Sequence, residues 1–203
     1  REICTLKQLS HPNIIRLRAI QLCHNDVFIV LDRADMDLHH LMKNVSPNTF
    51  TMRHFRLLTW QMLLGLQHLH GKGLVHRDLK PSNVLVNKSD CLLRLADFGT
   101  CRRIGDTEDC VNVTTAWYRS PESCGGIQEY TTAVDTWSAG CIMYELMQCV
   151  RHKLCSPLFN CKEHTNNDRQ MQCILSRMPC TVETLKKITT MDMCRKMTPY
   201  LQT

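Results

Sequence analysis

Apolar residues recur at helical spacing over residues 51–70 of the chain. Six of them stand mostly three or four positions apart, as on the buried face of an amphipathic helix: Phe55, Leu58, Met62, Leu63, Leu66 and Leu69. Gly71 follows them at the position where a helix C-cap is expected. The pattern therefore predicts one long helix that packs against a core on one side.

Two further segments carry the same spacing. A helix over residues 133–148 is predicted to bury a face composed of Val134, Trp137, Cys141, Ile142 and Leu146. Over residues 1–9, the apolar residues Ile3, Leu6 and Leu9 are three apart, which predicts a short amphipathic helix. That helix has no N-cap and starts at the first residue, so we expect the chain to begin inside a helix.

Strands are predicted where short apolar runs stand between turn signals. Residues 14–20 (IIRLRAI) and 27–31 (VFIVL) are separated by the sequence HND, which predicts two strands and a turn. Residues 84–86 and 92–95 are separated by NKSD, which predicts a second and shorter hairpin. Beyond Val150 the periodicity weakens, and the pattern assigns no element there.

Composition and charge narrow the protein class. The chain has 203 residues, of which 43% are hydrophobic and 22% charged, as in one ordinary globular domain. The net charge of +6 suits an anionic ligand, but the basic residues are scattered, so no nucleic-acid partner is expected. No run is long enough to cross a bilayer and no signal peptide is visible, so we expect a soluble intracellular protein without a membrane partner.

The cysteine count is high and odd, at 13. Cys149, Cys155, Cys161 and His164 are the nearest approach to a metal-ligand set, but their spacing matches no common zinc site. Without a secretory signal, a disulfide framework is not expected either. The cysteines are therefore expected to be mainly small core residues. His68 and His70 lack ligand-like companions and are expected at the surface or in helix packing.

Polar residues that could carry chemistry surround the shorter predicted hairpin. Asn83 stands just before it and Asp97 just after it, so the turn is expected to bring the two together. Amide and carboxylate oxygens are hard ligands that Mg²⁺ prefers. Asp78 offers a carboxylate that can take a proton from a hydroxyl group, and Lys80 offers a positive charge for a phosphoryl group. A base, a cation and two metal ligands are the parts that phosphoryl transfer requires.

The same residues resemble a known family. HRDLKPSN at 76–83, followed by DFG at 97–99, resembles the catalytic and metal-binding loops of the eukaryotic protein kinases. The similarity extends to REICTLKQLSHPNI at the start, TTAWYRSPE at 114–122 and DTWSAGCIMYEL at 135–146. It implies an α+β, bilobal protein-kinase fold, with a partial small lobe and hinge over residues 1–34 and a partial, mostly helical large lobe over residues 35–203. The small lobe would be reduced to a helix and about two strands.

The resemblance also implies roles for individual residues. Asp78 would orient the substrate hydroxyl and accept its proton, Lys80 would neutralise phosphoryl oxygens, and Thr115 would hydrogen-bond near Asp78. Asn83 and Asp97 would hold Mg²⁺, while His76 would pack beneath the metal loop and Asp135 would hold the catalytic-loop backbone. Leu31 would be the gatekeeper residue, and the backbone of Asp32 and Ala34 would bind adenine. The remaining residues of the implied ATP-binding set are Glu2, Lys80, Ser82, Asn83, Leu85 and Asp97.

Several details resemble the branch that contains cyclin-dependent and mitogen-activated kinases. WYRSPE, KPSN and PLF at 157–159 are typical of that branch, and DMDLHHLM at 35–42 is closer to the mitogen-activated side. This resemblance implies ATP-dependent phosphorylation of Ser or Thr in protein substrates, with Arg119 shaping a pocket for a following proline. It also implies an upstream kinase as a possible partner and a location in the cytoplasm or the nucleus.

The sequence departs from the family pattern in three places. The glycine-rich loop and the strand lysine that pairs with Glu2 would lie before residue 1, and the family continues with further helices after residue 203. The usual phosphorylated positions align with Cys110 and Asn112, although Glu108 or Asp109 in the sequence Thr107–Asp109 could replace a phosphate beside Arg77. A catalytically inactive kinase-like fragment that acts as a binding module therefore stays open as an alternative, and a small-molecule kinase is disfavoured by WYRSPE.

Overall fold

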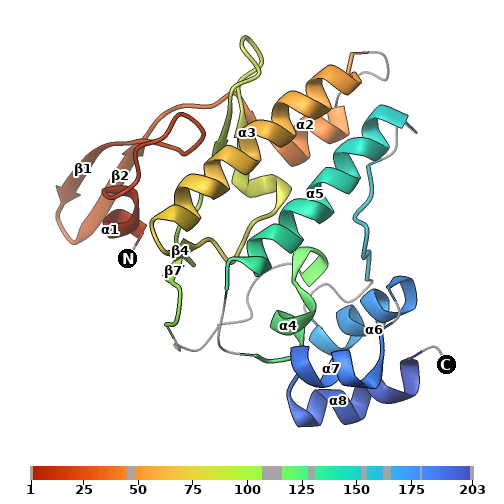
Figure 1. Cartoon of the computed structure of the whole chain (residues 1–203). Helices are drawn as coiled ribbons and strands as arrows, with labels where there is room; N and C mark the ends of the chain where they lie inside the picture. The colour runs from red at the N-terminus through yellow and green to blue at the C-terminus, as the bar shows by residue number, and fades with distance from the viewer. Residues whose placement is uncertain are drawn as a thin grey trace.

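The computed structural model describes residues 2–44, 49–106, 116–127, 131–151, 155–161, 166–178 and 180–201, with the side chain of Tyr200 excepted. Two long helices, α3 (Met52–Gly71) and α5 (Ala133–Arg151), run through the middle of the molecule and pack on each other (Figure 1). A β-hairpin and a short helix from the N-terminal part lie on one side of α3, and the C-terminal helices gather below α5 (Figure 1). Helices and small antiparallel sheets occur together, which confirms the α+β class.

The long helix α3 confirms the main prediction and corrects two of its details. Thr51 caps the helix through a capping box with His54. Leu58, Met62, Leu66 and Leu69 are buried as expected, but Leu63 is 44% exposed because the packed stripe is narrower than the apolar one. Gly71 is the last helical residue rather than the cap, and the left-handed turn falls on Gly73, whose φ is +70°. The C-cap is Lys72, so the predicted C-cap at Gly71 was wrong by one residue.

The helix α5 extends three residues beyond its predicted end. Val134, Cys141, Ile142 and Leu146 are buried as expected. The ring of Trp137 is only partly buried and stacks on Phe159, with 5.4 Å between ring centroids. The core thus lies mainly between α3, α5 and the short strands that cover α3.

The predicted hairpin over residues 84–95 is present. Strands β5 (Val84–Val86) and β6 (Leu93–Leu95) pair antiparallel, and β3 (Met36–Asp37) adds a third strand beside β5. This sheet packs against α3 at Gly65, where a Cβ atom would lie 3.0 Å from Cδ1 of Leu95 in β6 and 2.8 Å from the carbonyl oxygen of Asn13, which accepts the Leu95 N–H. Only glycine allows that approach, so Gly65 sets how closely the helix and the sheet pack.

A longer hairpin is formed by β1 (Leu17–Cys23) and β2 (Asp26–Leu31). The predicted first strand, residues 14–20, was placed three residues too early. Ile14 instead forms a parallel bridge to Leu95, and the Ile15 N–H donates to the Leu95 carbonyl oxygen at 2.8 Å. The apolar run is continuous through this point, so the pattern alone could not separate the bridge from the strand. Likewise, α1 (Glu2–Leu6) is shorter than the predicted helix over residues 1–9.

The remaining elements are short. They are the strands β4 (Leu74–Val75) and β7 (Arg102–Arg103), the α-helices α2 (Leu38–Asn44), α4 (Pro121–Cys124), α6 (Asn167–Arg177), α7 (Val182–Ile188) and α8 (Met191–Met197), and the 3₁₀ turns η1 (Pro81–Asn83), η2 (Ala116–Tyr118) and η3 (Thr198–Tyr200). The helices α6, α7 and α8, which the periodicity did not predict, are capped by Asn166, Thr181 and Thr190. Among the described residues, no helix combines the length and the apolar character needed to span a membrane.

Candidate active site

Asp135 fixes the start of the loop that carries the predicted catalytic residues. Its side chain is completely buried in the first turn of α5. Its two carboxylate oxygens accept the backbone N–H groups of His76 and Arg77 at 2.8 and 2.9 Å. Hydrogen bonds to a buried charged group are strong, so Asp135 holds the loop backbone as the sequence predicted.

His70 is a third partner of Asp135. Its Nε2 atom lies 2.8 Å from the carboxylate oxygen Oδ2. His70 thus lies in the packing between α3 and α5, as expected, and it adds a contact to Asp135 that the sequence did not predict. Its place in the last turn of α3 gives a geometric reason, because α3 ends beside the first turn of α5 and directly precedes the loop. The end of α3, the loop that follows it and the distant helix α5 thus meet at one carboxylate.

His76 connects the catalytic loop to the DFG segment. The imidazole is fully buried, with Nε2 3.0 Å from the Ala96 carbonyl oxygen and its ring centroid 5.0 Å from that of Phe98. Because a carbonyl only accepts hydrogen bonds, Nε2 carries the proton, and Nδ1 accepts the N–H of Asp78 at 3.4 Å. The Thr100 hydroxyl also donates to the His76 carbonyl oxygen at 2.9 Å. His76 is thus structural, as expected.

Asp78, Lys80 and Asn83 converge on one another. The Lys80 ammonium lies 2.8 Å from Oδ2 of Asp78. The Asn83 amide Nδ2 donates to the Asp78 carbonyl oxygen at 2.8 Å and to the same Oδ2 at 3.1 Å. The 3₁₀ turn η1 makes this possible, because it folds Asn83 back over Asp78. Both donors bind the same oxygen, and Asp78 is only 8% exposed. The carboxylate is therefore held in a fixed orientation.

The hairpin places Asp97 beside Asn83 along the chain register. Val84 pairs with Leu95, and the Ala96 N–H donates to the Asn83 carbonyl oxygen at 2.9 Å, so Asp97 directly follows the residue bonded to Asn83. Two residues next to the site are left-handed without being glycine: Arg77 has a φ of 71° and Asp97 a φ of 61°. Such conformations are uncommon and concentrate at functional sites.

These donors fit a hard divalent cation. The Nδ2 atom of Asn83 is occupied by Asp78, which leaves the amide oxygen as the atom free to act as a ligand. The side chain of Asp97 is exposed, and no hydrogen bond to its carboxylate is present within the described ranges. An amide oxygen and an uncommitted carboxylate form an oxygen-only donor set, which suits Mg²⁺.

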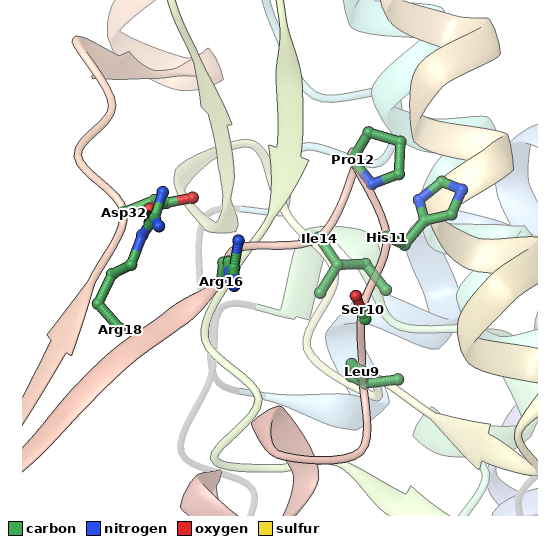
Figure 2. Close-up of a pocket in the computed structure, with 8 residues that line it drawn as sticks. All are labelled: Leu9, Ser10, His11, Pro12, Ile14, Arg16, Arg18 and Asp32. Atoms are coloured by element: carbon green, nitrogen blue, oxygen red, sulfur yellow. Dashed lines mark hydrogen bonds and ion pairs between the residues drawn. The ribbon is translucent and has the colours of Figure 1, made fainter.

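The predicted adenine-binding residues lie where β2 ends. Leu31 is the last residue of the strand, and the Asp32 N–H donates to the Arg16 carbonyl oxygen at 3.0 Å. The Asp32 carboxylate forms an ion pair with Arg18 at the edge of a pocket of about 290 Å³ (Figure 2). The predicted role of Asp32 uses its backbone, so this side-chain pair is compatible with it. Leu31, Ala34 and Leu85 are partly buried, and Ser82 is exposed.

Other predicted residues fall in different parts of the chain. Glu2 is partly buried in the first turn of α1. Thr115, the sequence Thr107–Asp109, Cys110 and Asn112 lie outside the described residues. Their roles therefore stay predictions.

Comparison with known proteins gives the family. The sequence profile of the family described as "Protein kinase domain" matches residues 1–198. The chain belongs to the protein kinase family. The mixed fold with its catalytic-loop hairpin is accordingly a partial protein-kinase fold, as the sequence predicted.

Curated relatives of this kinase are mitogen-activated kinases. It is 39% identical to mitogen-activated protein kinase 4 of Arabidopsis thaliana over 175 residues, which is 83% of this chain and 44% of that protein. It is 42% identical to mitogen-activated protein kinase 11 of the same plant over 153 residues, covering 72% of this chain and 41% of that protein. Mitogen-activated protein kinase 1 of Oryza sativa subsp. japonica is 38% identical over 83% of this chain and 42% of its own length. The chain is thus mitogen-activated-kinase-like and spans less than half the length of these relatives.

The WYR segment of this kinase is held by contacts from several elements. The Trp117 indole N–H donates to the Cys161 carbonyl oxygen at 2.9 Å. The Arg119 guanidinium donates to Oδ1 of Asn167 in α6 at 2.7 Å. The Ser138 hydroxyl of α5 donates to the Tyr118 carbonyl oxygen at 2.7 Å. These three residues, 117–119, are called the WYR platform below.

Glu145 is a buried contact of the WYR platform that the sequence analysis missed. Its carboxyl oxygen accepts the Tyr118 hydroxyl at 2.7 Å, and Glu145 is 2% exposed. Burial raises the pKa of the Glu145 carboxyl to about 7, with the Tyr118 hydrogen bond acting against that rise, and burial also raises the pKa of Tyr118 well above its usual value. The available signal was an acidic residue beside Cys141, Ile142 and Leu146 on the apolar face of α5.

The cysteines of this kinase give one departure from expectation. Cys149 and Cys155 form a disulfide, so they are not available together as zinc ligands. His164, the fourth member of the weighed zinc set, lies outside the described residues. Among the residues that the structure describes, no cluster of three or more His, Cys, Asp or Glu side chains could hold a metal ion.

Proposed function

We propose that this chain carries the catalytic loop of a protein serine/threonine kinase that transfers the γ-phosphate of ATP to proline-directed sites. The observation that carries the proposal is the Asp78 carboxylate, which Lys80 and Asn83 fix through one oxygen beside the DFG segment. Family membership and the resemblance to mitogen-activated kinases support the same reaction.

Asp78 is proposed to orient the attacking hydroxyl. Its Oδ2 atom is already committed to Lys80 and Asn83, so Oδ1 is the oxygen that accepts the hydroxyl proton of a Ser or Thr substrate. The backbone of the loop is fixed by Asp135, so Asp78 does not have to reorganise when the substrate arrives. Thr115 would add a hydrogen bond near Asp78.

Lys80 and the metal-ligand pair are proposed to manage the phosphate charge. The Lys80 ammonium, 2.8 Å from Asp78, lies where negative charge gathers on the transferring phosphoryl group. Asn83 and Asp97 are the residues that would hold Mg²⁺. When bound, Mg²⁺ supplies charge neutralisation and orientation for the phosphates of ATP.

ATP is proposed to bind between the end of β2 and the β3–β5–β6 sheet. The chain passes from Leu31 to β3 within a few residues, and Asp37 of β3 pairs with Leu85 of β5. This pairing brings the segment with Asp32 and Ala34 near Leu85, a position suited to the adenine ring. Ser82 and Lys80 would face the phosphates, and Glu2 would contribute from α1. Residues 1–34 then act as the small-lobe part and hinge, and residues 35–203 as the large-lobe part.

The proposed substrates are proteins with Ser or Thr followed by Pro. The Arg119 guanidinium is held by Asn167, so the WYR platform presents a fixed surface after the phosphoacceptor. An upstream kinase is a proposed partner, by analogy with the named mitogen-activated kinases. Such substrates would be met in the cytoplasm or the nucleus.

Phosphate transfer to a Ser-Pro peptide, measured with radiolabelled ATP and Mg²⁺, tests the proposal. Asp78→Asn is expected to lower kcat by about 10²–10⁴-fold, since general-base catalysis contributes that much. The matched control Asp26→Asn alters an exposed carboxylate at the start of β2 and should leave kcat unchanged. A Ser-Ala peptide should be phosphorylated more slowly than the Ser-Pro peptide. If the unmodified protein transfers no phosphate and shows no thermal shift with Mg²⁺ and ATP, the inactive binding module is the correct reading instead.

A further inference from the structure

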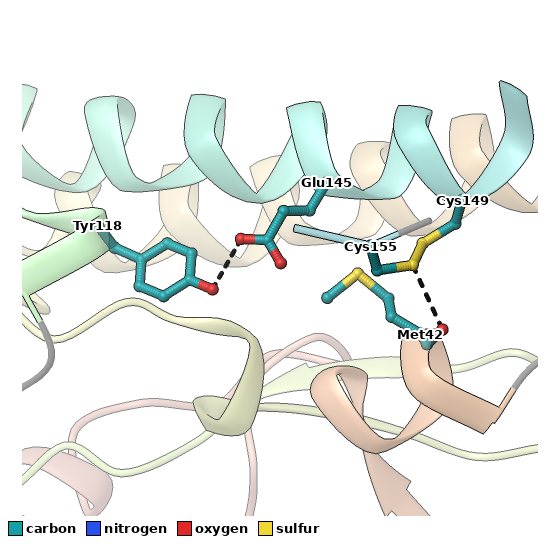
Figure 3. The surroundings of a disulfide bond; sticks show 5 residues. All are labelled: Met42, Tyr118, Glu145, Cys149 and Cys155. Carbon is teal, nitrogen blue, oxygen red and sulfur yellow. Dashed lines mark hydrogen bonds between the residues drawn. A yellow bond between two sulfur atoms is a disulfide. The ribbon is translucent and has the colours of Figure 1, made fainter. Parts of the chain in front are cut away.

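The disulfide between Cys149 and Cys155 lies at a structural junction. Cys149 is 3% exposed near the C-terminal end of α5, and Cys155 is partly exposed at the start of residues 155–161. Their Cα atoms are 5.4 Å apart, a usual separation for two disulfide-bonded cysteines. The Cys155 sulfur also lies 3.3 Å from the Met42 carbonyl oxygen of α2 (Figure 3). The crosslink therefore joins α5 to a segment that touches α2.

Residues 155–161 lead directly to the WYR platform. Phe159, 1% exposed, stacks on Trp137 of α5, and the Cys161 carbonyl oxygen accepts the Trp117 indole N–H. The segment is thus tied to α5 at Cys155 and Phe159, and it holds Trp117 at its far end. Loss of the crosslink would free the first of these attachments.

The same end of α5 holds the neighbouring platform residue. Glu145, one helical turn before Cys149, accepts the Tyr118 hydroxyl (Figure 3). Trp117 and Tyr118 are therefore held by two elements, the segment 155–161 and α5, that the disulfide connects. We propose that Cys149 and Cys155 form a reversible thiol–disulfide modification site whose oxidation by a peroxide stabilises the WYR platform.

The oxidation can be written with peroxide as the oxidant. The Cys155 thiol, the more exposed of the two, loses its proton and attacks hydrogen peroxide; an S–O bond forms, the O–O bond breaks, and the departing hydroxide takes up that proton, which gives a sulfenic acid and water. The Cys149 sulfur then attacks the Cys155 sulfur, the S–S bond forms, the S–O bond breaks, and the hydroxide leaves with the Cys149 proton as a second water. Two thiols and one peroxide give one disulfide and two waters. A dithiol reverses the reaction by two exchange steps and is itself oxidised.

Three other buried thiols in the described part of the kinase are poorly suited to this chemistry. Burial raises the pKa of the Cys124 and Cys141 thiols to about 12 and that of Cys101 to about 11. These groups stay protonated near neutral pH, and the thiolate is the reactive form. Cys4 and Cys23 are exposed but form no disulfide among the described residues. Disulfide formation is therefore expected at the Cys149–Cys155 pair rather than at these five cysteines.

The test follows the crosslink and the platform without any kinase assay. The protein is reduced with dithiothreitol, treated with hydrogen peroxide, alkylated and mapped by mass spectrometry. The linked Cys149–Cys155 peptide should form and disappear again on reduction. The oxidised form should melt about 4–8 °C higher, as a small closed loop in a chain of this size implies. Amide hydrogen exchange over residues 116–119 should slow roughly threefold or more on oxidation.

Variants separate the proposal from general oxidation effects. Cys155→Ser should show the reduced wild-type melting temperature and exchange rate under both conditions. The matched control Cys173→Ser removes a partly buried free cysteine of α6 and should behave as wild type. If no linked peptide forms, or if exchange over residues 116–119 is the same in oxidised and reduced wild type, the proposal is wrong. Since none of these measurements uses phosphate transfer, they stand apart from the test of kinase activity.

Discussion

Of the two hairpins of this kinase, the one with the longer paired strands is the more exposed to solvent, and the one with the shorter strands is the more buried. The β1–β2 hairpin pairs over most of both strands, yet Leu22, Val27 and Phe28 are 76%, 54% and 53% exposed. The β5–β6 hairpin pairs only three residues with three, and Val84, Leu93 and Leu95 are completely buried. The shorter hairpin is covered by α3 and α2, whereas the longer one extends away from α3 and α5, with only the short helix α1 beside it in Figure 1.

The difference shows what positions the candidate site. Ladder hydrogen bonds alone leave a hairpin marginally stable in water, and an apolar face must be buried to fix it. The β5–β6 hairpin meets that condition through Gly65 of α3, and its ends carry Asn83 and Asp97. The positions of the site residues are therefore fixed by packing and by the buried Asp135 more than by the length of the strands.

The largest effect is expected at Asp135. Asp135→Asn replaces one of the two accepting oxygens by an NH₂ group, which faces a backbone N–H of His76 or Arg77 and leaves it unpaired. The free energy of unfolding should fall by about 3–5 kcal/mol, as when a buried charged partner is removed. Urea unfolding measures this, with the exposed Asp192→Asn as the matched control. A loss below that of an ordinary surface change would show that the loop is fixed by packing alone.

A smaller effect should separate the two hairpins directly. Leu95→Ala removes a side chain that is completely buried, so we expect a loss of about 3–4 kcal/mol in the free energy of unfolding. Leu22→Ala removes one that is 76% exposed, and the loss should stay within about 0.5 kcal/mol. Thermal and urea unfolding of both variants provide the comparison. Equal losses would contradict the difference drawn between the hairpins.

Glu145 should give the smallest effect, and it depends on pH. Its folded pKa of about 7 exceeds the ordinary value of 4.5, so between these values the folded protein keeps a proton that the unfolded chain has released. Stability from this group therefore falls as the pH rises through that interval, by about 3 kcal/mol in total.

Glu145→Gln keeps an acceptor for Tyr118 and removes the titration. The variant should gain stability over wild type as the pH rises from about 5 to about 8, with the gain complete above the folded pKa. Urea unfolding at several pH values measures it. Parallel pH profiles for the two proteins would mean that the buried carboxyl does not carry this dependence.

The parts predicted from sequence are those with a local pattern. The helix α3 and the β5–β6 hairpin follow from spacing and from a turn between apolar runs, whereas the roles of Asp78, Lys80 and Asn83 were implied by the resemblance to protein kinases. The helices α7 and α8 have seven residues each, too short for a stripe to stand out, although their caps Thr181 and Thr190 were visible in the sequence. These two N-cap threonines are the local signal from which both helices could have been predicted.

Contacts between residues that are distant in sequence were the main features that the sequence did not predict. His70 and Glu145 act through residues that are 65 and 27 positions away, and no local pattern reports such a pairing. Cys149 and Cys155 are six residues apart, a separation that allows a disulfide. The sequence has 13 cysteines, however, and no local pattern selects this pair. Only the three-dimensional arrangement of α5 against the following segment resolves it.

The left-handed backbone at Arg77 and Asp97 has a consequence for directed evolution. Glycine adopts that conformation freely, while other residues lose roughly 1–2 kcal/mol there. A library screened for thermal stability alone would thus be enriched in glycine at both positions, and the selected variants would lack the Asp97 carboxylate. Selection for thermal stability and selection for catalytic turnover therefore favour different residues at these two positions.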